Sequence, residues 1–469
     1  MEKDEVTIGH GSKTHSTWRQ HFPALLSIFL LALIVRLLTA YFIGTHFDDA
    51  GWFPFGIYNI FDTEAKTILD GGASAFWIGD PSHTNAAIYP PGYPLWLAFV
   101  YAIGGSSPQL VQVIQLILDS ASVLLIAAIG INIFKWRVGI IAGVFAALSP
   151  LLTFYGASPL ADAPTSWLVL SGVYMLSRAA KQENVYWALG AGMMIGASCW
   201  FRANAFLLMF VWAAALFLYI KAAWRKRLLV AFAVILGSLL LISPIVVRNS
   251  IAFHAFVPTG LGAGTNLWEG IGETDRAAEF GAVYGDRELL EKERVELNLP
   301  QDETVTLYWP DGVKRDRERM RKALNVIGSH PVWYAGVMVR RMWGLLKFAG
   351  EDSGIYGTTG INITTAKCLP PEWRFFPLTM IVTALGYVQS ILRYIILPPM
   401  LVGILLAARE NRRMTLLILA TVFYYLVFGT ALHSEIRYSL PMQAVLFIFA
   451  GVAASWIVSK IRHRESVES

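Results

Sequence analysis

The chain has 469 residues, of which 55% are hydrophobic and only 15% are charged. Soluble domains carry about 25% charged residues, and the mean hydropathy here is +0.51. These values exclude a soluble enzyme, a disordered chain and a fibrous repeat. The net charge of +5 indicates no nucleic acid partner, because much of the excess lies in short loops between apolar segments.

The apolar segments predict an all-α polytopic membrane protein with about ten transmembrane helices, re-entrant or interfacial helices and outer-face loops. Several stretches reach the roughly 18 apolar residues that a helix needs to cross a bilayer. The predicted spans, in chain order, are 22–44, 109–133, 138–156, 163–178, 185–201, 205–220, 228–247, 378–407, 414–432 and 439–459.

Basic loops orient these spans. Positive charges follow the second, fourth, sixth, eighth and tenth spans, and they fall on one side if the first span leaves the cytoplasm. We therefore expect a multi-pass protein of the cell (inner) membrane with both termini cytoplasmic. The predicted regions are a cytoplasmic tail at 1–21, helices one to seven at 22–249, an extracytoplasmic region at 250–377, helices eight to ten at 378–460, and a tail at 461–469.

Two apolar stretches are excluded from the spans. Residues 92–105 are too short, and counting them would place every later basic loop outside, so we expect a re-entrant or interfacial element. Residues 332–349 carry Arg340 and Arg341 at their middle, which a lipid-facing helix would resist. We expect an amphipathic helix on the outer surface.

Polar residues gather in two long outer segments. The first, residues 45–91, holds six acidic residues and one basic residue, and the second, residues 250–331, holds fourteen acidic and ten basic residues. Much of the second is typical of solvated surface helices with mixed charges. Because the spans are poor in charge, we expect chemistry at the outer membrane surface.

Three acidic positions in outer loops are candidates for catalysis. Asp48 and Asp49 directly follow the first span, where a carboxylate can act as a general base or help to hold a divalent ion; ordinary loop solvation is the alternative. Asp162 lies in the turn SPLADAP and either takes part in catalysis or caps the following helix. One aspartate pair is too little to infer a metal site, so a divalent metal stays an open alternative and no cofactor is assigned.

Cationic side chains lie at the outer ends of the predicted spans. One arginine at such a place is explained by snorkelling. Four such groups on one face, beside acidic loops, favour a phosphate-binding rim, because guanidinium matches phosphate oxygens bidentately. The four are Arg202, Arg248, His433 and Arg437.

Two further motifs complete the set. The segment YPPGYP, with Tyr89 and Tyr93, predicts a stiff turn with interfacial aromatics. Arg248 and Asn249 precede a glycine-containing loop that ends in Asn266-Leu267-Trp268, and a flexible outer loop is the alternative to a substrate-binding loop there.

In order and in placement, these motifs resemble the GT-C superfamily of integral-membrane glycosyltransferases. The resemblance is nearest to the bacterial branch related to protein O-mannosyltransferases and to the aminoarabinose transferase of lipid A. It rests on the acidic residues after the first span, YPPGYP, SPLADAP, RNSIAFHAFVPTGLGAGTNLW and EIRYSLPMQ.

The resemblance implies a polyprenyl-phosphate-linked sugar donor and transfer on the extracytoplasmic face. The family's loop-one aspartate is equivalent to Asp49 or Asp48, or to Asp62 if WFPFGIYN is not an insertion, and we favour Asp49. Its acidic turn is equivalent to Asp162. The donor phosphate would lie against Arg248, Arg437, Arg202 and His433, and Tyr89, Tyr93, Asn249 and Asn266 would belong to substrate loops.

We therefore expect a membrane glycosyltransferase, a hexosyl- or pentosyl-transferase, that inverts the anomeric centre. Its partners would be the lipid-linked donor, a glycan, lipid or protein acceptor, and the bilayer, with no nucleic acid. The alternative is a transporter or flippase of a lipid-linked saccharide, which would use the same arginines without a catalytic carboxylate.

Overall fold

The computed structural model describes residues 13–49, 52–78, 89–302, 305–346, 362–433 and 435–468. Regular secondary structure in these ranges is helical, apart from one isolated bridge between Thr306 and Trp309. The all-α prediction is confirmed. Most of the predicted tail at 1–21 and the loop residue Asp80 lie outside the described residues.

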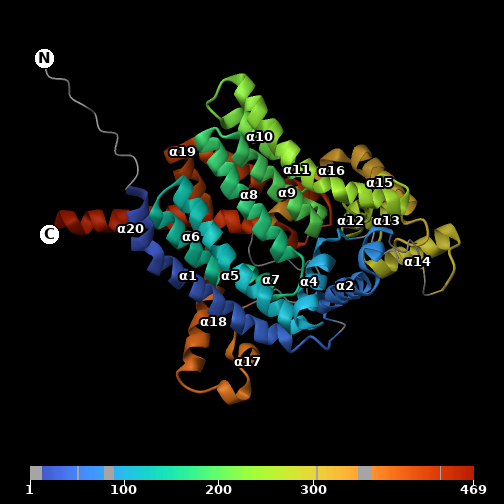
Figure 1. Cartoon of the computed structure of the whole chain (residues 1–469), viewed down its shortest axis with the longest axis horizontal. Helices are drawn as coiled ribbons and strands as arrows, with labels where there is room; N and C mark the ends of the chain where they lie inside the picture. Colours follow the sequence, from blue (N-terminus) through green and yellow to red (C-terminus); the bar gives the residue numbers. More distant parts are fainter. Residues whose placement is uncertain are drawn as a thin grey trace.

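The first half of the chain forms a bundle of helices (Figure 1). Its elements are α1 (Lys13–Gly44), α2 (Phe53–Ile78), α4 (Gly92–Gly104), α5 (Pro108–Ile133), α6 (Trp136–Leu148), α7 (Pro150–Ala157), α8 (Asp162–Gln182), α9 (Val185–Phe201), the 3-10 turn η1 (Ala203–Ala205), α10 (Leu208–Tyr219) and α11 (Trp224–Phe253).

The second half adds a polar lobe and returns to the bundle. The polar lobe comprises α12 (Ala263–Gly272), α13 (Ala277–Phe280), α14 (Asp286–Leu297), α15 (Gly312–Ser329) and α16 (Pro331–Leu346). The remaining elements are α17 (Thr365–Cys368), η3 (Pro371–Trp373), α18 (Leu378–Ile395), α19 (Leu397–Ala431), η4 (Ile436–Ser439) and α20 (Leu440–Glu468).

Six of the described helices are long and apolar enough to cross a membrane, and a seventh span results if α6 and α7, bent by 62°, are counted as one. The chain is thus a multi-pass membrane protein, but ten spans are not confirmed. The predicted spans at 163–178, 185–201 and 205–220 do form helices, α8 to α10. They are shorter or less apolar than the other spans.

The prediction of one helix over residues 378–407 is wrong. α18 ends at Ile395, and α19 starts at Leu397 with Pro398 and Pro399 in its first turn. Proline fits there because the first-turn amides have no intrahelical acceptor, whereas inside a continuous helix it would remove a hydrogen bond. α19 is itself kinked at Asn411, whose backbone leaves the helical region.

Small residues let the helices of the bundle approach closely, as is usual in membranes. A side chain added at Gly192 of α9 would meet the Val234 carbonyl oxygen of α11 at 2.0 Å, and one added at Gly237 would meet the Leu189 oxygen at 2.2 Å. α9 and α11 therefore pack backbone to backbone. This contact sets how α9 and α11 lie against each other, and so helps to place Arg202, just after α9, and Arg248, in the last part of α11.

The charge inside the first two spans is paired. Arg36 Nε lies 2.5 Å from Asp119 Oδ2, both side chains are buried, and Trp167 Nε1 donates to the other carboxylate oxygen at 2.6 Å. A buried ion pair with its remaining oxygen satisfied avoids the cost of an isolated charge in the bilayer. This pair joins α1, α5 and α8.

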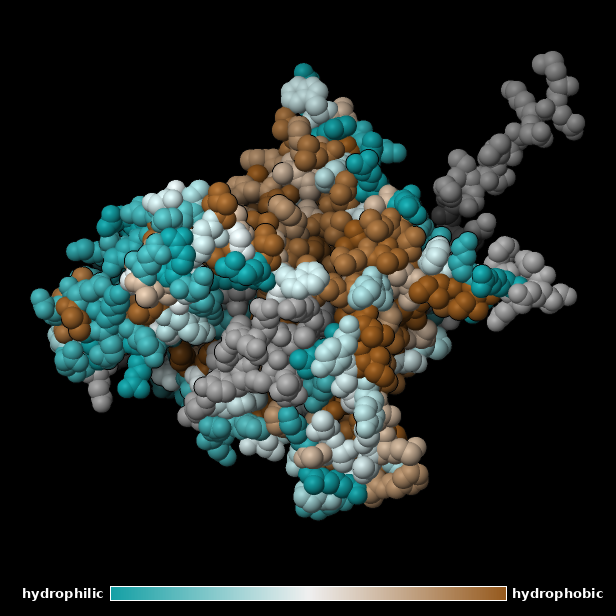
Figure 2. Space-filling view, turned by 180° about the vertical axis from the view of Figure 1, so that it is seen from behind, coloured by the Kyte–Doolittle hydropathy of each residue, from teal (hydrophilic) through white to brown (hydrophobic). Residues whose placement is uncertain are grey.

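The polar lobe is more than a solvated surface. Its exterior is hydrophilic and lies beside the hydrophobic band of the bundle (Figure 2). Inside it, Glu293 of α14 accepts hydrogen bonds from Arg315 and Arg319 of α15 at 2.6 Å each, and all three side chains are buried. Asp316 accepts from the Gly264 and Thr265 amides at 3.3 and 3.0 Å. The predicted surface helices thus share an ionic core.

Both stretches excluded from the spans are short helices. α4 has 13 residues and packs against α2. The described residues of the predicted surface helix at 332–349 belong to α16. Arg341 of α16 donates to the Thr430 and Leu432 carbonyl oxygens at 3.1 and 3.0 Å, so it joins the lobe to α19 and does not face lipid. Cys199 and Cys368 are both free and buried.

Candidate functional site

The candidate site lies at the end of the bundle that contacts the polar lobe. It is formed by α2, the start of α4, the turn before α8, the end of α9, the last part of α11 and the segment between α19 and α20. Each of these elements supplies a charged or phenolic side chain. The helix ends gather here because α9, α11 and α20 are packed along their lengths in the bundle core.

Asp162 and Arg202 form a buried pair. Arg202 Nε lies 2.9 Å from Asp162 Oδ1, and its Nη2 donates to Oδ2 at 2.9 Å. Although Asp162 lies in the first turn of α8, its carboxylate makes no capping hydrogen bond there. This ion pair, with its one hydrogen bond, explains the aspartate better than the capping alternative, and it holds the end of α9 against the start of α8.

The segment between α19 and α20 carries three charged side chains in a row of contacts. His433 Nδ1 is bonded to Glu273 of the polar lobe, and its Nε2 lies 3.1 Å from Glu435. Glu435 is in turn paired with Arg437. Burial disfavours the charged imidazole, but the bonds to Glu273 and Glu435 prevail and raise the pKa of His433 to about 10.

Glu435 is the carboxylate at the centre of this row. Burial opposes its charge, but Arg437 and His433 prevail and lower the pKa of Glu435 to about 2. His433 and Arg437 are thus cations that share one anion. Both ring nitrogens of His433 contact carboxylates. Arg437 is the cation of this segment that lies nearer the start of α20.

Arg248 and Asn249 are hydrogen-bonded to each other but have different roles. Asn249 accepts from Arg248 Nη1 at 2.9 Å and donates to the Val257 and Thr259 carbonyl oxygens at 3.0 and 3.1 Å. Asn249 therefore holds the loop that follows α11. Arg248 interacts electrostatically with Glu64 of α2, so the arginine side chain belongs to the site.

Glu64 is the residue that sequence reasoning missed. Burial raises its pKa to about 7, against the opposing effect of the nearby Arg248, and its Oε1 has no hydrogen-bond partner among the described residues. A carboxyl group with a pKa near neutrality, beside an arginine, is typical of functional sites. The signal in the sequence was its place two residues after Asp62 in the acidic loop.

Tyr89 connects these groups. Its hydroxyl interacts electrostatically with Arg437 of η4, with Arg202 at the end of α9 and with Glu64 of α2, so three segments bring charged groups near one phenol. Tyr93 is fully buried and donates to Gln115 Oε1 at 3.2 Å. The rings of Tyr89 and Tyr93 make edge-to-face contacts with Phe61 of α2, with ring centroids 4.9 and 5.0 Å apart. The YPPGYP segment therefore brings Tyr89 to the charged groups, while Tyr93 anchors the segment.

The three loop-one aspartates differ in surroundings. Asp62 accepts from Tyr101 at 2.7 Å and from Lys66 at 2.8 Å, on the side of α2 that faces α4. Asp48 and Asp49 are exposed in the turn after α1. The Asp49 carbonyl oxygen accepts from the Trp52 amide at 3.0 Å, and the Trp52 ring stacks on His46 and lies 6.2 Å from the ring of Phe154 in α7. Phe154 contacts Tyr155, a neighbour of Arg437 and Arg202.

Asn266 has a structural place in the polar lobe. Its side-chain amide donates to the Gly262 carbonyl oxygen at 2.8 Å, and its own carbonyl oxygen accepts from the His433 amide at 2.7 Å. It thus holds the loop from α11 and the segment from α19 together. Within the described ranges, no group of three or more His, Cys, Asp or Glu side chains is arranged to hold a metal ion.

Two comparisons with known proteins give matches, one to part of the sequence and one to the fold. Residues 89–247 match the family model for dolichyl-phosphate-mannose-protein mannosyltransferase. This range contains YPPGYP, the SPLADAP turn and Arg202, and it ends just before Arg248. No curated protein matches the sequence.

Solved structures of an oligosaccharyltransferase from Archaeoglobus fulgidus share the fold. The form tethered with an acceptor peptide containing the NVT sequon gives a TM-score of 0.54 at 14% identity, over 96% of this chain and 51% of that one. The apo form gives 0.53 at 16%, over 98% and 52%. The complex of AglB with an inhibitory peptide and a dolichol-phosphate gives 0.50 at 13%, over 96% and 52%.

At these identities the structural likeness shows the fold alone, and the chain spans about half the length of the structures it matches. The family match is independent of the structural likeness, because it is a similarity of sequence. Together they confirm the resemblance that the motifs predict: this chain is similar to the GT-C membrane glycosyltransferases.

Proposed function

We propose that this protein transfers a sugar from a polyprenyl-phosphate donor to an acceptor on the extracytoplasmic face of the cell membrane. The observation that carries the proposal is the convergence of Arg202, Arg248 and Arg437 with buried carboxylates at one end of the bundle. Arginines at this depth suit a lipid phosphate, which they can bind bidentately.

The donor would approach from the membrane, with its prenyl chain among the spans and its phosphate beside Arg248 and Arg437. Arg202 is bonded to Asp162, so its contribution would be to shape the site and to add to its positive potential. His433 and Glu435 position the segment that carries Arg437. The match to a family described by a dolichyl-phosphate sugar supports this class of donor.

The chemical step would be a single in-line displacement. An acceptor oxygen or nitrogen forms a bond to the anomeric carbon, the bond between that carbon and the phosphate oxygen breaks, and the phosphate leaves with the electron pair. The acceptor's proton passes to a carboxylate, for which we propose Asp49. The arginines stabilise the charge that develops on the phosphate. One such displacement inverts the anomeric centre.

Asp49 is preferred over Asp62 as the base because of their surroundings. Asp62 is bonded to Tyr101 and Lys66 on the far side of α2. Asp49 lies close in sequence to Trp52, whose ring contacts Phe154 of α7. Phe154 in turn contacts Tyr155, which interacts with Arg437 and Arg202. Asp48 is the neighbouring candidate in the same turn.

The test uses purified protein in nanodiscs with a panel of polyprenyl-phosphate sugars and an envelope extract as acceptor. Release of polyprenyl phosphate should fall by about 10²–10⁴-fold in Asp49→Asn. The control Asp62→Asn should keep most of it, since its carboxylate faces α4. Normal release by Asp49→Asn would contradict the assignment. Transport of the intact lipid-linked saccharide without sugar release would contradict the transferase.

A further inference from the structure

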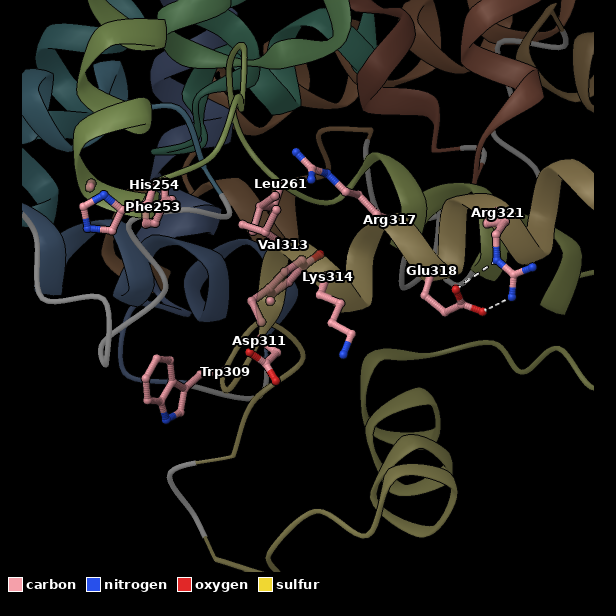
Figure 3. Close-up of a pocket in the computed structure, with 13 residues that line it drawn as sticks. Phe253, His254, Leu261, Trp309, Asp311, Val313, Lys314, Arg317, Glu318 and Arg321 are labelled. Atoms are coloured by element: carbon pink, nitrogen blue, oxygen red, sulfur yellow. Dashed lines mark hydrogen bonds and ion pairs between the residues drawn. The ribbon is translucent and has the colours of Figure 1, made fainter.

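A separate cavity lies where the last turn of α11 meets the start of α15 (Figure 3). Its volume is about 600 Å³, and none of the candidate site residues lines it. Phe253 and His254 lie on one side, from the end of α11, and Lys314 and Arg317 lie on the other, from α15. The cavity thus joins the bundle to the polar lobe.

The depth of this cavity follows from α11. This helix is one of the candidate membrane spans, and Phe253 is its last residue. Its exposed apolar side chains Ile251 and Val247 lie within the last two turns of the helix, where lipid would cover them. A cavity at the end of such a helix lies where the hydrocarbon gives way to the headgroups.

The cavity wall carries three basic side chains and two acidic ones, Asp311 and Glu318, so cations are in excess by one. Lys314, Arg317 and Arg321 follow one another at i, i+3 and i+7 spacing, which places them on one face of α15. Arg321 is paired with Glu318 at 2.6 Å. For Lys314 and Arg317, no ion pair exists with any described carboxylate, and Figure 3 shows both extending without a bond to the acids drawn.

The uncharged part of the wall is mainly aromatic and apolar, with His254 at the end of α11. Trp309 is half-buried at the edge of the cavity, and Phe253 and Leu261 complete the apolar part. Tryptophan is enriched at membrane interfaces, where its ring sits at the level of the headgroups. Arg317 Nη2 donates to the Phe256 carbonyl oxygen at 3.4 Å. The cavity therefore combines two cations that have no described carboxylate partner with a surface suited to the glycerol and first methylene groups of a lipid.

We propose that this cavity binds the phosphate-bearing headgroup of an anionic membrane lipid. Arg317 and Lys314 would contact the phosphate, and Phe253 and Trp309 would contact the beginning of the acyl chains. The bound lipid would hold α15 against the end of α11, and so fix the polar lobe to the membrane surface. This site is independent of the proposed transferase activity, because it shares no side chain with it.

The test measures lipid retained by the full-length protein in native mass spectrometry, with phosphatidylglycerol or zwitterionic phosphatidylcholine added. Wild-type protein should retain phosphatidylglycerol preferentially, and Arg317→Gln should weaken this binding by about tenfold. Arg287→Gln is the matched control, since Arg287 is exposed on α14 and does not line the cavity. Val313→Phe should also weaken binding, because it fills the cavity without changing charge.

Equal retention of phosphatidylglycerol by wild type, Arg317→Gln and Val313→Phe would overturn the proposal. Inorganic phosphate forms the second arm. If it displaces the lipid only weakly, the lipid is the occupant. If it binds in lipid-free detergent and the protein does not prefer phosphatidylglycerol over phosphatidylcholine, the occupant is a free phosphate ion and the lipid proposal is wrong.

Discussion

The buried carboxyl group of Glu64 has a pKa near neutrality, whereas a glutamate in an unfolded chain titrates near 4.5. The folded protein therefore holds this proton while the unfolded chain has released it, so the stability that the protonated form gives is lost as the pH rises from about 4.5 to about 7. Arg248 opposes the effect only partly. The environment of one side chain thus makes the whole fold sensitive to pH in the neutral range.

Glu64→Gln should remove this dependence. The variant keeps the shape of the side chain and cannot ionise, so its unfolding temperature in detergent should gain on wild type as the pH rises from 5 to 8. Glu288→Gln, at an exposed position of α14, is the matched control. If the difference in unfolding temperature between wild type and Glu64→Gln stays constant from pH 5 to 8, the pKa of Glu64 is not raised.

The bonds of His433 predict a second pH effect, which has the same sign as that of Glu64 but lies at higher pH. Its pKa is raised to about 10, so the stability from its charged form is complete below about 6.5 and is lost as the pH rises through 10. His433→Gln should lower the free energy of unfolding by on the order of 2 kcal/mol at pH 7. The loss should shrink towards pH 10.

Thermal unfolding across this pH range measures the effect. His330→Gln serves as the control, because His330 contacts the rings of Phe280 and Trp333 in the same lobe. If both histidine variants show the same dependence on pH, the network of His433 with Glu273 and Glu435 does not hold the imidazolium.

At the scale of helices, the backbone contact of α9 with α11 positions two arginines of the site. Gly192→Ala should destabilise the protein by about 1–3 kcal/mol, because its added carbon would lie 2.0 Å from the Val234 oxygen and backbone cannot yield easily. Gly190→Ala, two residues earlier, would meet only the flexible Met175 sulfur at 3.0 Å and should be nearly neutral. Unfolding temperatures compare the two, and equal values would contradict the close packing.

The helices themselves were predictable because apolar length is a local property of the sequence. The break at Pro398 and Pro399 was missed although its signal is local, since two prolines inside a supposed span indicate a new helix start. The less apolar α8 and the shorter α9 and α10 were also predicted as spans. Their burial within the bundle, rather than length alone, is what makes them part of the core.

The site was predictable only in part, because the residue types are visible in the sequence and their partners are not. Arg202, Arg248, Arg437 and Asp162 were singled out, and the fold brings them to one end of the bundle. That Asp162 pairs with Arg202, or that Glu435 lies between two cations, depends on contacts between segments far apart in the chain. Asn249 and Asn266 proved to hold loops in place.

At the scale of the whole molecule, polarity divides the chain into two parts. The polar lobe covers one end of the apolar bundle, and the start of α1 lies beside the end of α20 at the opposite end (Figures 1 and 2). The distribution of basic loops predicts that the ends of α1 and α20 are cytoplasmic. Together these observations predict that the polar lobe and the candidate site are extracytoplasmic.

Single cysteines test this orientation, since Cys199 and Cys368 are buried. Val295→Cys places a thiol on α14, where the side chain is 77% exposed, and Lys221→Cys places one in the exposed loop between α10 and α11. In intact spheroplasts, a membrane-impermeant maleimide should label Val295→Cys at once and Lys221→Cys only after permeabilisation. The reverse pattern would place the polar lobe in the cytoplasm. The proposed transfer from a lipid-linked donor would then take place on that side.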